Sequence, residues 1–369
     1  MPRYKFDQIA YNITEKKMPE PGEEKMYIGL EHLDTGSLRV TRWGSDVELT
    51  GEKLKMKKGD ILFGRRNTYL RRAAIAPHDG IFSAHGMIFR PKTEVIDPDY
   101  FPFFISSDYF MDAAIRISVG SLSPTVNWKA LKDLEFDIPS LAEQSKSAEI
   151  LQAINDTKEA YQDLLQKTDE LVKSQFIEMF GDPVTSSKGR KQVPFAEFMT
   201  NIRYGTSQPP QFSDHGEYRF IRATNIKRGR ITEENMLRIS EEEASKIPKC
   251  KLDGNEIIIV RSGANTGDTC VVTSDYAGDY AGYDIIISLD LERGNPVYFN
   301  ELINTHYMEQ VVKPLTARSA QPHLNAKQVQ EMPIIVATLD EQNEFAAIVE
   351  QSDKSKYSLG GRICLMKML

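Results

Sequence analysis

Several short blocks of this 369-residue chain occur twice, in the same order and at nearly the same separation. The matching pairs are residues 27–36 with 220–229 at an offset of 193, 61–65 with 257–261 at 196, and 141–144 with 339–342 at 198. Such a long-range repeat is typical of a duplicated structural unit. The slow drift of the offset indicates loop insertions between the blocks, so we expect two copies of one unit.

Each copy begins with a globular part in which strand and helix signals are mixed. Short runs of β-branched and aromatic residues are bounded by Gly, Asn and Asp, as strands are. These runs lie at residues 60–63, 81–89, 256–260, 269–273 and 283–289. A helix is expected next in each copy, at 102–117 and 297–314, and then a short extended run at 133–138 and 331–336. The expected fold class is α+β, internally duplicated, with two α/β domains.

Residues 141–180 contain neither proline nor glycine, and their apolar residues recur at helical spacings. A helix of this length would measure about 60 Å and would end at Gly181-Asp182-Pro183. Because so long a helix cannot bury itself, it needs a partner helix, and the segment 339–369 is the candidate. The residues expected in the core of this coiled-coil-like helix pair are Leu151, Ile154, Tyr161, Leu165, Val172, Phe345, Ile348 and Val349.

These signals divide the chain into four segments. We expect a globular domain at 1–140, a central helix at 141–183, a second globular domain at 184–338 and a distal helix at 339–369. The distal helix is about a dozen residues shorter than the central one and contains Gly360-Gly361. Glycine is a poor helix former, so we expect an interruption at that pair.

The net charge of −7 argues against a nucleic-acid partner, but the charges are segregated along the chain. Residues 53–72 carry a net charge of +7 and residues 186–232 carry +6, whereas residues 141–182 carry −5. A solvated face explains either basic segment alone equally well. Two basic segments on either side of an acidic one favour an anionic partner for the globular parts, because the local field decides such an encounter.

Several classes of protein are not indicated by this composition. No run approaches 18 consecutive apolar residues, and the first residues lack the apolar segment of a secretory signal. The cysteines Cys250, Cys270 and Cys364 are odd in number and far apart. They fit neither a disulfide framework nor a zinc cluster, and free thiols suit a reducing compartment. We therefore expect a cytoplasmic protein without a membrane span or metal site.

The motifs of common enzyme classes are also missing from the sequence. The glycine-rich stretch 261–267 lacks the Gly-Lys-Ser/Thr ending of a phosphate-binding loop. The six histidines form no i, i+4 pair for zinc, and no Gly-x-Ser-x-Gly element is present. Converging carboxylates for a metal-dependent hydrolase cannot be assembled either. We expect no catalytic residues in this chain.

Three groups of residues resemble a known family. Ile138-Pro139 is followed by Leu141-Ala-Glu-Gln144, the segment 173–183 reads KSQFIEMFGDP, and Leu339-Asp-Glu-Gln342 repeats the first motif. Together with the duplication, these residues resemble the central and distal conserved regions of the specificity (S) subunits of type I restriction-modification systems. The resemblance covers essentially the whole chain, although the globular parts match only in outline.

This resemblance implies a non-catalytic reader of double-stranded DNA. The segments 1–140 and 184–338 would be target recognition domains, each reading one half of a bipartite, asymmetric DNA sequence. The helices at 141–183 and 339–369 would form an antiparallel pair that spaces the half-sites and binds two methyltransferase (M) subunits. Two restriction (R) subunits would complete the complex. S-adenosylmethionine, ATP and Mg²⁺ are expected only on these partner subunits, and no cofactor is expected in this chain.

Two loops that follow strand-like runs carry the side chains that we expect to read bases. Arginine presents two donors to guanine and asparagine pairs with adenine, so both can read the major groove. In the first copy these residues are Arg65, Arg66, Asn67, Tyr69, Arg71 and Arg72, and in the second they are Arg261, Ser262 and Asn265. The alternative is an exposed turn whose charge is incidental.

Further DNA contacts are expected in three other places. Lysines and arginines of basic turns suit phosphates, which fix register without reading sequence. The additional candidates are Ser121, Ser123, Thr125, Arg203, Tyr204, Lys227, Arg228, Arg230, Arg318, Ser319, Gln321 and His323. Solvated loops and helix capping are the alternatives for these groups.

Two other readings of the chain stay open at this point. The short distal helix ends in an apolar stretch at 363–369, which would suit a truncated or inactive specificity subunit. A duplicated protein-interaction scaffold is the second alternative, in which the globular parts bind proteins. The sequence reveals neither the DNA target nor its spacer length.

Overall fold

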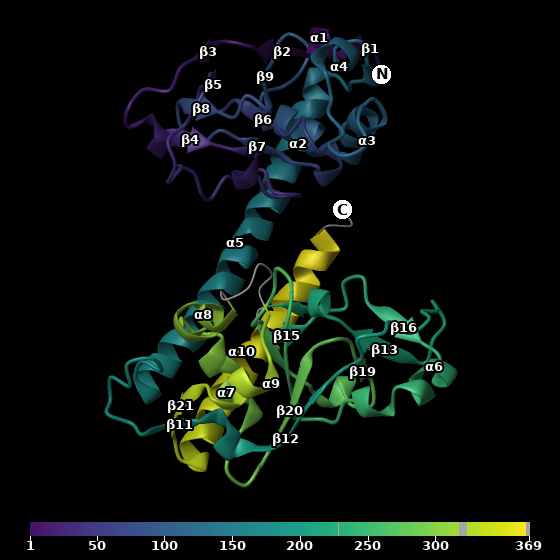
Figure 1. The fold of residues 1–369 in the computed structure, drawn as a ribbon. Coiled ribbons are helices and arrows are strands. Elements are labelled where there is room, and N and C mark those ends of the chain that lie inside the picture. The colour runs from purple at the N-terminus through teal and green to yellow at the C-terminus, as the bar shows by residue number, and fades with distance from the viewer. Residues whose placement is uncertain (228, 317–322, 367–369) are drawn as a thin grey trace. The chain divides into compact units, whose positions relative to one another are not determined.

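The computed structural model describes residues 1–227, 229–316 and 323–366, with side chains described up to residue 356. The chain divides into two compact units, Met1–Glu159 and Ala160–Leu369, which we call the first and the second unit. Each unit combines sheets with helices (Figure 1), and this confirms the expected α+β class. Among the described residues, no helix is long and apolar enough to cross a membrane.

The first unit is built on two sheets, one of order β2-β9-β6-β7 and one of order β3-β5-β8-β4, with β1 and β10 paired separately. Its strands are β1 (Arg3–Lys5), β2 (Ala10–Ile13), β3 (Lys16–Lys17), β4 (Tyr27–Ile28), β5 (Lys53–Met56), β6 (Ile61–Phe63), β7 (Ala73–Ile75), β8 (Gly80–Phe82), β9 (Met87–Pro91) and β10 (Glu135–Asp137). Its helices are α1 (Phe6–Ile9), α2 (Phe101–Ser106), α3 (Asp108–Arg116), α4 (Trp128–Leu131) and the beginning of α5 (Leu141–Phe180).

The second unit repeats this plan with sheets of order β12-β20-β17-β18 and β16-β13-β19. Its strands are β11 (Gln192–Pro194), β12 (Met199–Tyr204), β13 (Tyr218–Ile221), β14 (Ile226–Lys227), β15 (Arg230–Ile231), β16 (Leu237–Ile239), β17 (Ile257–Ile259), β18 (Thr269–Val271), β19 (Tyr280–Ala281), β20 (Ile285–Leu289) and β21 (Pro333–Ile335). Its helices are α6 (Glu241–Lys246), α7 (Pro296–Ile303), α8 (Lys313–Thr316), α9 (Ala326–Gln330) and α10 (Leu339–Met366).

The pairing of strands confirms the duplication at the level of single residues. Strand β4 pairs in parallel with β8 through Tyr27 and Ile81, and β13 pairs in parallel with β19 through Phe220 and Tyr280. Strands β6 and β17 occupy the same place in their sheets and alternate in the same way, because their first and third side chains enter one core and the second enters another. Side chains of a strand point alternately to opposite faces, so this all-apolar run is buried on both faces in both units.

Helix α5 spans Leu141–Phe180, as predicted. Gly181 follows with a φ of 84°, a left-handed conformation that ends helices and suits glycine. The expected interruption of the distal helix was wrong, because α10 continues through Gly360-Gly361 to Met366. A glycine inside a helix costs only about 1 kcal/mol relative to alanine, which the packing of the preceding turns can offset.

Two other expected helices are each divided into shorter ones. The segment expected at 102–117 forms α2 and α3, because Ser107 has an extended conformation and accepts a hydrogen bond from the amide of Phe110 as an N-cap. The segment expected at 297–314 forms α7 and then, after a break, a π-helical turn at Met308–Val312 that leads into α8. The spacing of apolar residues reveals neither the N-cap at Ser107 nor the π-helical turn at Met308–Val312.

Both long helices begin with the same set of contacts. Glu143 accepts a hydrogen bond from the amide of Ser140 at 2.9 Å, and Glu341 accepts one from the amide of Thr338 at 2.8 Å. These pairs are capping boxes, in which a Glu three residues into the helix satisfies the N-cap amide. Arg190 also bonds to Glu341, and these bonds hold the pKa of that carboxyl at about 2.

A fully buried glutamine follows each capping box. Gln342 accepts a hydrogen bond from the amide of Asn295 at 2.8 Å and donates to the carbonyls of Arg293 and Ala337. Gln144 makes the same three bonds in the first unit, to Asp97, Val95 and Pro139. We call Gln144 and Gln342 the junction glutamines, because each fastens the start of a long helix to the loop before a helix of its own unit.

Replacing Gln342 by alanine is expected to lower the free energy of unfolding of the second unit by about 2–3 kcal/mol, because buried backbone groups lose their partners. Trp43 and Trp128 lie in the first unit, so tryptophan fluorescence reports the first unit while circular dichroism reports both. Urea unfolding followed by both signals would show the change in circular dichroism alone. Gln351→Ala, at an exposed position of α10, is the control, and equal effects of the two changes would contradict the prediction.

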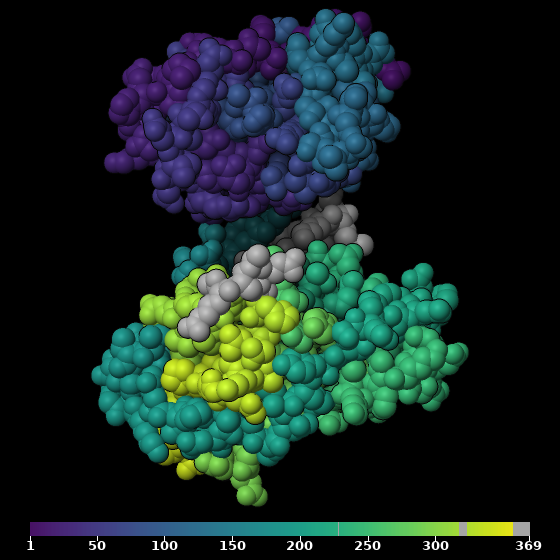
Figure 2. Space-filling view, in the orientation of Figure 1, coloured from purple at the N-terminus to yellow at the C-terminus, as the bar shows by residue number. Residues whose placement is uncertain are grey.

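The end of α5 and α10 form an antiparallel pair inside the second unit. The ring of Phe345 lies 5.4 Å from that of Phe176 and 5.5 Å from that of Phe180, whereas Lys356, further along α10, pairs with Asp169, earlier on α5. Tyr298 of α7 joins the same aromatic cluster. In Figure 2 the yellow side chains of α10 are open to the surface beside the green ones of the same unit.

The predicted core of the helix pair is confirmed in part. Val172, Phe345 and Val349 are buried in one apolar cluster of the second unit. The remaining predicted core residues are only half-buried, and they are Leu151, Ile154, Tyr161, Leu165 and Ile348. The close packing is therefore concentrated at the C-terminal end of α5.

Candidate nucleic-acid interface

In the first unit, the loop that leaves β6 pairs with the loop that precedes α4. The carbonyl of Arg65 accepts a hydrogen bond from the amide of Val126 at 2.9 Å, and Arg66 forms a β-bridge with Thr125. The structure thus brings together two groups of candidate residues that lie about 60 positions apart in the sequence.

The side chains of these two loops also meet. Arg66 donates to the hydroxyl of Ser123 at 3.4 Å, and Arg65 donates to the side-chain oxygen of Asn127 at 3.4 Å. Both bonds are long for N–H···O contacts, and Arg66 itself is exposed. The two guanidinium groups are therefore weakly held and can exchange these partners for others.

The second unit repeats this arrangement at the exit of β17. The carbonyl of Arg261 accepts a hydrogen bond from the amide of Leu324 at 2.8 Å, and Ser262 forms a β-bridge with His323. The corresponding contacts of the first unit lie 196 residues earlier in one loop and 198 earlier in the other. Both units therefore present the same backbone construction at this place.

Arg261 is held much more tightly than its counterpart. Its guanidinium lies over the rings of both Tyr204 and Tyr283, 4.5 and 4.3 Å from their centroids, and the side chain contacts His323. Only 8% of the residue is exposed. Burial raises the pKa of Asp284, which accepts a bond from the Arg261 amide, to about 6. Burial and the nearby Arg261 lower the pKa of His323.

The first unit has no matching pair of tyrosines at this place. Strand β9 pairs with β6 in the register in which β20 pairs with β17, so His85 occupies the backbone position of Tyr283. Among the described residues, no ring contact to Arg65 is found. The two loops share a backbone but differ in side-chain chemistry.

Tyr283 is a functional candidate that sequence reasoning missed. The sequence feature that could have identified Tyr283 is its position directly before β20, the strand that lies between β12 and β17. Tyr204 ends β12 and pairs with Ile285. The order of strands in the sheet, with β20 between β12 and β17, brings Tyr204 and Tyr283 to the same edge as Arg261.

Arg203 was expected to contact DNA, but the structure engages its guanidinium entirely within the second unit. It forms a two-pronged ion pair with Glu256, whose side chain is 4% exposed. It also donates to the carbonyls of Lys249 and Lys251 and to the hydroxyl of Ser288. Arginine has five donors, and these five bonds use all of them. The Arg203 guanidinium is therefore paired inside its own unit, with 20% of the side chain exposed, and a DNA contact of this residue stays a prediction.

The remaining candidates of the first unit divide into bound and open side chains. Arg71 forms ion pairs with Asp108 and Asp112, and Arg72 donates to the carbonyl of Leu30 at 3.0 Å. Tyr69 is 56% exposed. The other candidates in this unit are Asn67, which is half-buried, and Ser121, which is exposed.

In the hairpin of β14 and β15, the two basic side chains that the structure describes, Lys227 and Arg230, both pair with carboxylates. Lys227 pairs with Glu234 at 2.6 Å, and Arg230 pairs with Asp353 of α10. Asn265 donates to the carbonyl of Ala223 at 3.3 Å. Four further candidates lie outside the described residues, and these are Arg228, Arg318, Ser319 and Gln321.

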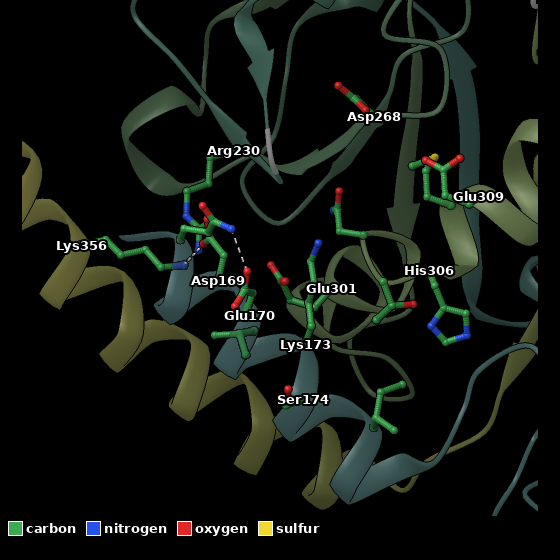
Figure 3. A pocket seen from close by; sticks show the side chains of 16 residues that line it. Asp169, Glu170, Lys173, Ser174, Arg230, Asp268, Glu301, His306, Glu309 and Lys356 are labelled. Atoms are coloured by element: carbon green, nitrogen blue, oxygen red, sulfur yellow. Dashed lines mark hydrogen bonds and ion pairs between the residues drawn. The ribbon is translucent and has the colours of Figure 1, made fainter. Parts of the chain in front are cut away.

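A cleft of about 1050 Å³ lies in the second unit between the end of α5, α7 and the π-helical turn. Figure 3 shows side chains of both charges around it, among them Lys173, Glu301, His306 and Lys356. Burial raises the pKa of Glu301 and of Asp268. No group of carboxylates, histidines or cysteines among the described residues could hold a metal ion.

Comparisons with known proteins show which family this chain is similar to. The family model described as type I restriction modification DNA specificity domain matches residues 11–168 and 196–362. The EcoDI specificity subunit, a type I restriction enzyme subunit of Escherichia coli, is 24% identical over 165 residues. These residues are 44% of this chain and 36% of that protein, so the match spans about a third of the length of this curated relative.

The fold is also similar to a solved structure. The crystal structure of the S subunit of a type I restriction-modification system from M. genitalium matches with a TM-score of 0.58 and 12% sequence identity. The match covers 100% of this chain and 93% of that one. At this identity, the likeness concerns the fold alone.

Proposed function

The chain belongs to the family of type I restriction modification DNA specificity domains, of which it carries two copies, and on this premise we propose that it reads a bipartite, asymmetric DNA target. Each unit would read one half-site, and α5 would connect the two readers. The chain itself would be non-catalytic and would direct two methyltransferase and two restriction subunits to the target. S-adenosylmethionine, ATP and Mg²⁺ would bind to those subunits.

One observation supports the proposal most strongly. The exit loops of β6 and β17 have the same backbone pairing with the loop before a short helix, yet Arg261 contacts the rings of two tyrosines and Arg65 contacts none among the described residues. Duplicated backbones that present different side chains suit two readers of different sequences. Arginine and asparagine side chains on such loops can distinguish guanine and adenine in the major groove.

Methylation sequencing of cells that make this chain together with its methyltransferase partner tests the proposal. The expected result is a modified motif composed of two different short half-sites separated by a fixed gap, absent from cells without the chain. A stable complex with the methyltransferase and an unchanged methylome would contradict it. Binding to DNA that weakens linearly with the logarithm of salt concentration would separate a DNA reader from a protein-interaction scaffold.

Within the first unit, two substitutions are expected to have different effects on DNA binding. Arg65→Ala should cost about 1–3 kcal/mol for the cognate base and relax one position of a single half-site, because a guanidinium that reads a base edge is lost. Lys57 is exposed directly after β5, and we expect it to contact a phosphate. Lys57→Ala should therefore weaken binding to all sequences alike, because a phosphate contact carries no sequence information. Competition binding against a library of half-site variants distinguishes the two outcomes. Uniform loss for both variants would show that Arg65 contacts phosphate.

A further inference from the structure

Each unit contacts its long helix at a second point, beyond the junction glutamine. In the first unit, the ammonium group of Lys158 on α5 donates to the carbonyl of Gly36 at 2.7 Å. Gly36 has a φ of 70°, a left-handed turn conformation that favours glycine. Lys158 lies 14 residues after Gln144, or about 21 Å along the helix.

The second unit has a corresponding contact on α10. Arg230 of β15 pairs with Asp353 through two nitrogens, one of them at 3.1 Å. Its neighbour Gly229 has a φ of 82° and lies 193 residues after Gly36, at the offset of that repeat block. A long helix of each unit is therefore contacted at the glycine turn itself in the first unit and by the residue that follows the glycine in the second.

Further charges reinforce the contact in the second unit. Lys356, which lies 198 residues after Lys158, pairs with Asp169 of α5 and lies 3.6 Å from Asp353. Figure 3 shows Arg230, Lys356 and Asp169 close together at one end of the cleft. The side chain of Lys356 is only 13% exposed, so solvent screens this network less than a surface pair.

We propose that these two contacts, Lys158 with Gly36 and Arg230 with Asp353, are positioning contacts that fix the tilt of each unit on its helix. We call them the turn contacts. In the first unit, Lys158 contacts the globular part far along α5 from the junction glutamine. In the second unit, Arg230 ties the β14–β15 hairpin to α10 beyond the apolar cluster that holds Phe345 and Val349. A contact far from the start of the helix resists rotation of the unit about that start. Resting on the proposed function, this assigns to the turn contacts a role in selecting the length of the spacer between half-sites.

The role of Arg230 distinguishes this proposal from simple phosphate binding. If Arg230 neutralised a phosphate, Asp353→Asn would free the guanidinium and would maintain or strengthen DNA binding. If Arg230 positions the unit, Asp353→Asn and Arg230→Ala act in the same direction, because either change removes the pair. DNA binding by the two variants therefore distinguishes phosphate binding by Arg230 from positioning of the unit.

The first experiment uses the full chain without DNA. Hydrogen exchange of residues 226–231 is expected to be about tenfold faster in Asp353→Asn than in the unchanged chain, with little change of the unfolding midpoint, because only the local contact is lost. Glu350→Gln on the exposed side of α10, which removes the pair with Lys354, is the matched control. Unchanged exchange in Asp353→Asn would overturn the proposal.

The second experiment measures the methylation motif in cells that make the full complex. For Asp353→Asn, Arg230→Ala and Lys158→Ala, the share of modified sites with a spacer one base pair longer or shorter is expected to rise about tenfold, the size of effect that a lost coupling contact produces. Both half-site sequences should stay unchanged. The controls are Glu350→Gln and Lys167→Ala, an exposed lysine of α5.

The outcomes of this second experiment separate two kinds of failure. If the unchanged chain gives no bipartite motif, the proposed function fails, and the hydrogen-exchange result alone judges the contact. If the unchanged chain gives the motif but all three variants keep a single spacer length, the inference about the turn contacts is overturned while the proposed function stands.

Discussion

Phe176→Ala is expected to lower the free energy of unfolding of the second unit by about 3–5 kcal/mol, the usual cost of removing a buried aromatic ring. Phe176 is fully buried and contacts Phe180, Tyr298 and Phe345 with ring centroids 4.9–5.4 Å apart. The rings of Phe180, Tyr298 and Phe345 are rigid, so they fill the space left by Phe176 only in part. Urea unfolding should show the loss in circular dichroism, while tryptophan fluorescence from the first unit keeps its midpoint.

Leu171→Ala is the control for this experiment, because Leu171 lies on the same helix and is 64% exposed. Its expected effect is within about 0.5 kcal/mol, as for most surface changes. A comparable loss for both variants would mean that the helix itself, and not its packing on α7 and α10, determines the stability of this region. A shift of the fluorescence midpoint with Phe176→Ala would contradict the assignment of the cluster to the second unit.

Arg203→Ala is expected to destabilise the second unit by about 3–5 kcal/mol, because it leaves the buried carboxylate of Glu256 without its partner. Removal of both charges in the double variant Arg203→Met, Glu256→Met should cost less than the single change, since no buried charge then stays unpaired. Lys249→Ala, at an exposed neighbouring position, is the control. The measurement is urea unfolding by circular dichroism in the absence of DNA.

This prediction also distinguishes two roles of Arg203. A DNA-contacting arginine would leave the stability of the free chain unchanged and would alter only binding. A normal unfolding midpoint for Arg203→Ala, combined with weaker DNA binding, would therefore return Arg203 to the interface.

The features predicted well from sequence were those that depend on local pattern. The helix at 141–180 follows from apolar spacing without proline or glycine, and Gly181 marks its end. The duplication follows from the repeated blocks, because matching segments in one order adopt matching structures. The short apolar run of β6 also predicts a strand, because it is a local pattern of β-branched and aromatic residues.

The features missed were those in which partners lie far apart in the chain. Arg203 and Glu256 are separated by 53 positions, so a basic stretch looked like a DNA-binding surface although its arginine is paired internally. The junction glutamines belong to the repeated Leu-x-Glu-Gln motif, but their hydrogen bonds are made to a loop 47–49 residues away. Tyr283 and Asp353 acquire their roles only through strand order and helix packing.

The two-point attachment of the first unit to α5 has a consequence for angular precision. The two points lie about 21 Å apart along the helix, and a well-supported contact holds its partners to about 0.5 Å, so the tilt is defined to about 1.4°. Across a domain of about 30 Å, that error displaces the far surface by about 0.7 Å. One base pair advances the duplex by about 3.4 Å. For a unit that reads DNA as proposed above, this positional error would be a fraction of one base-pair step.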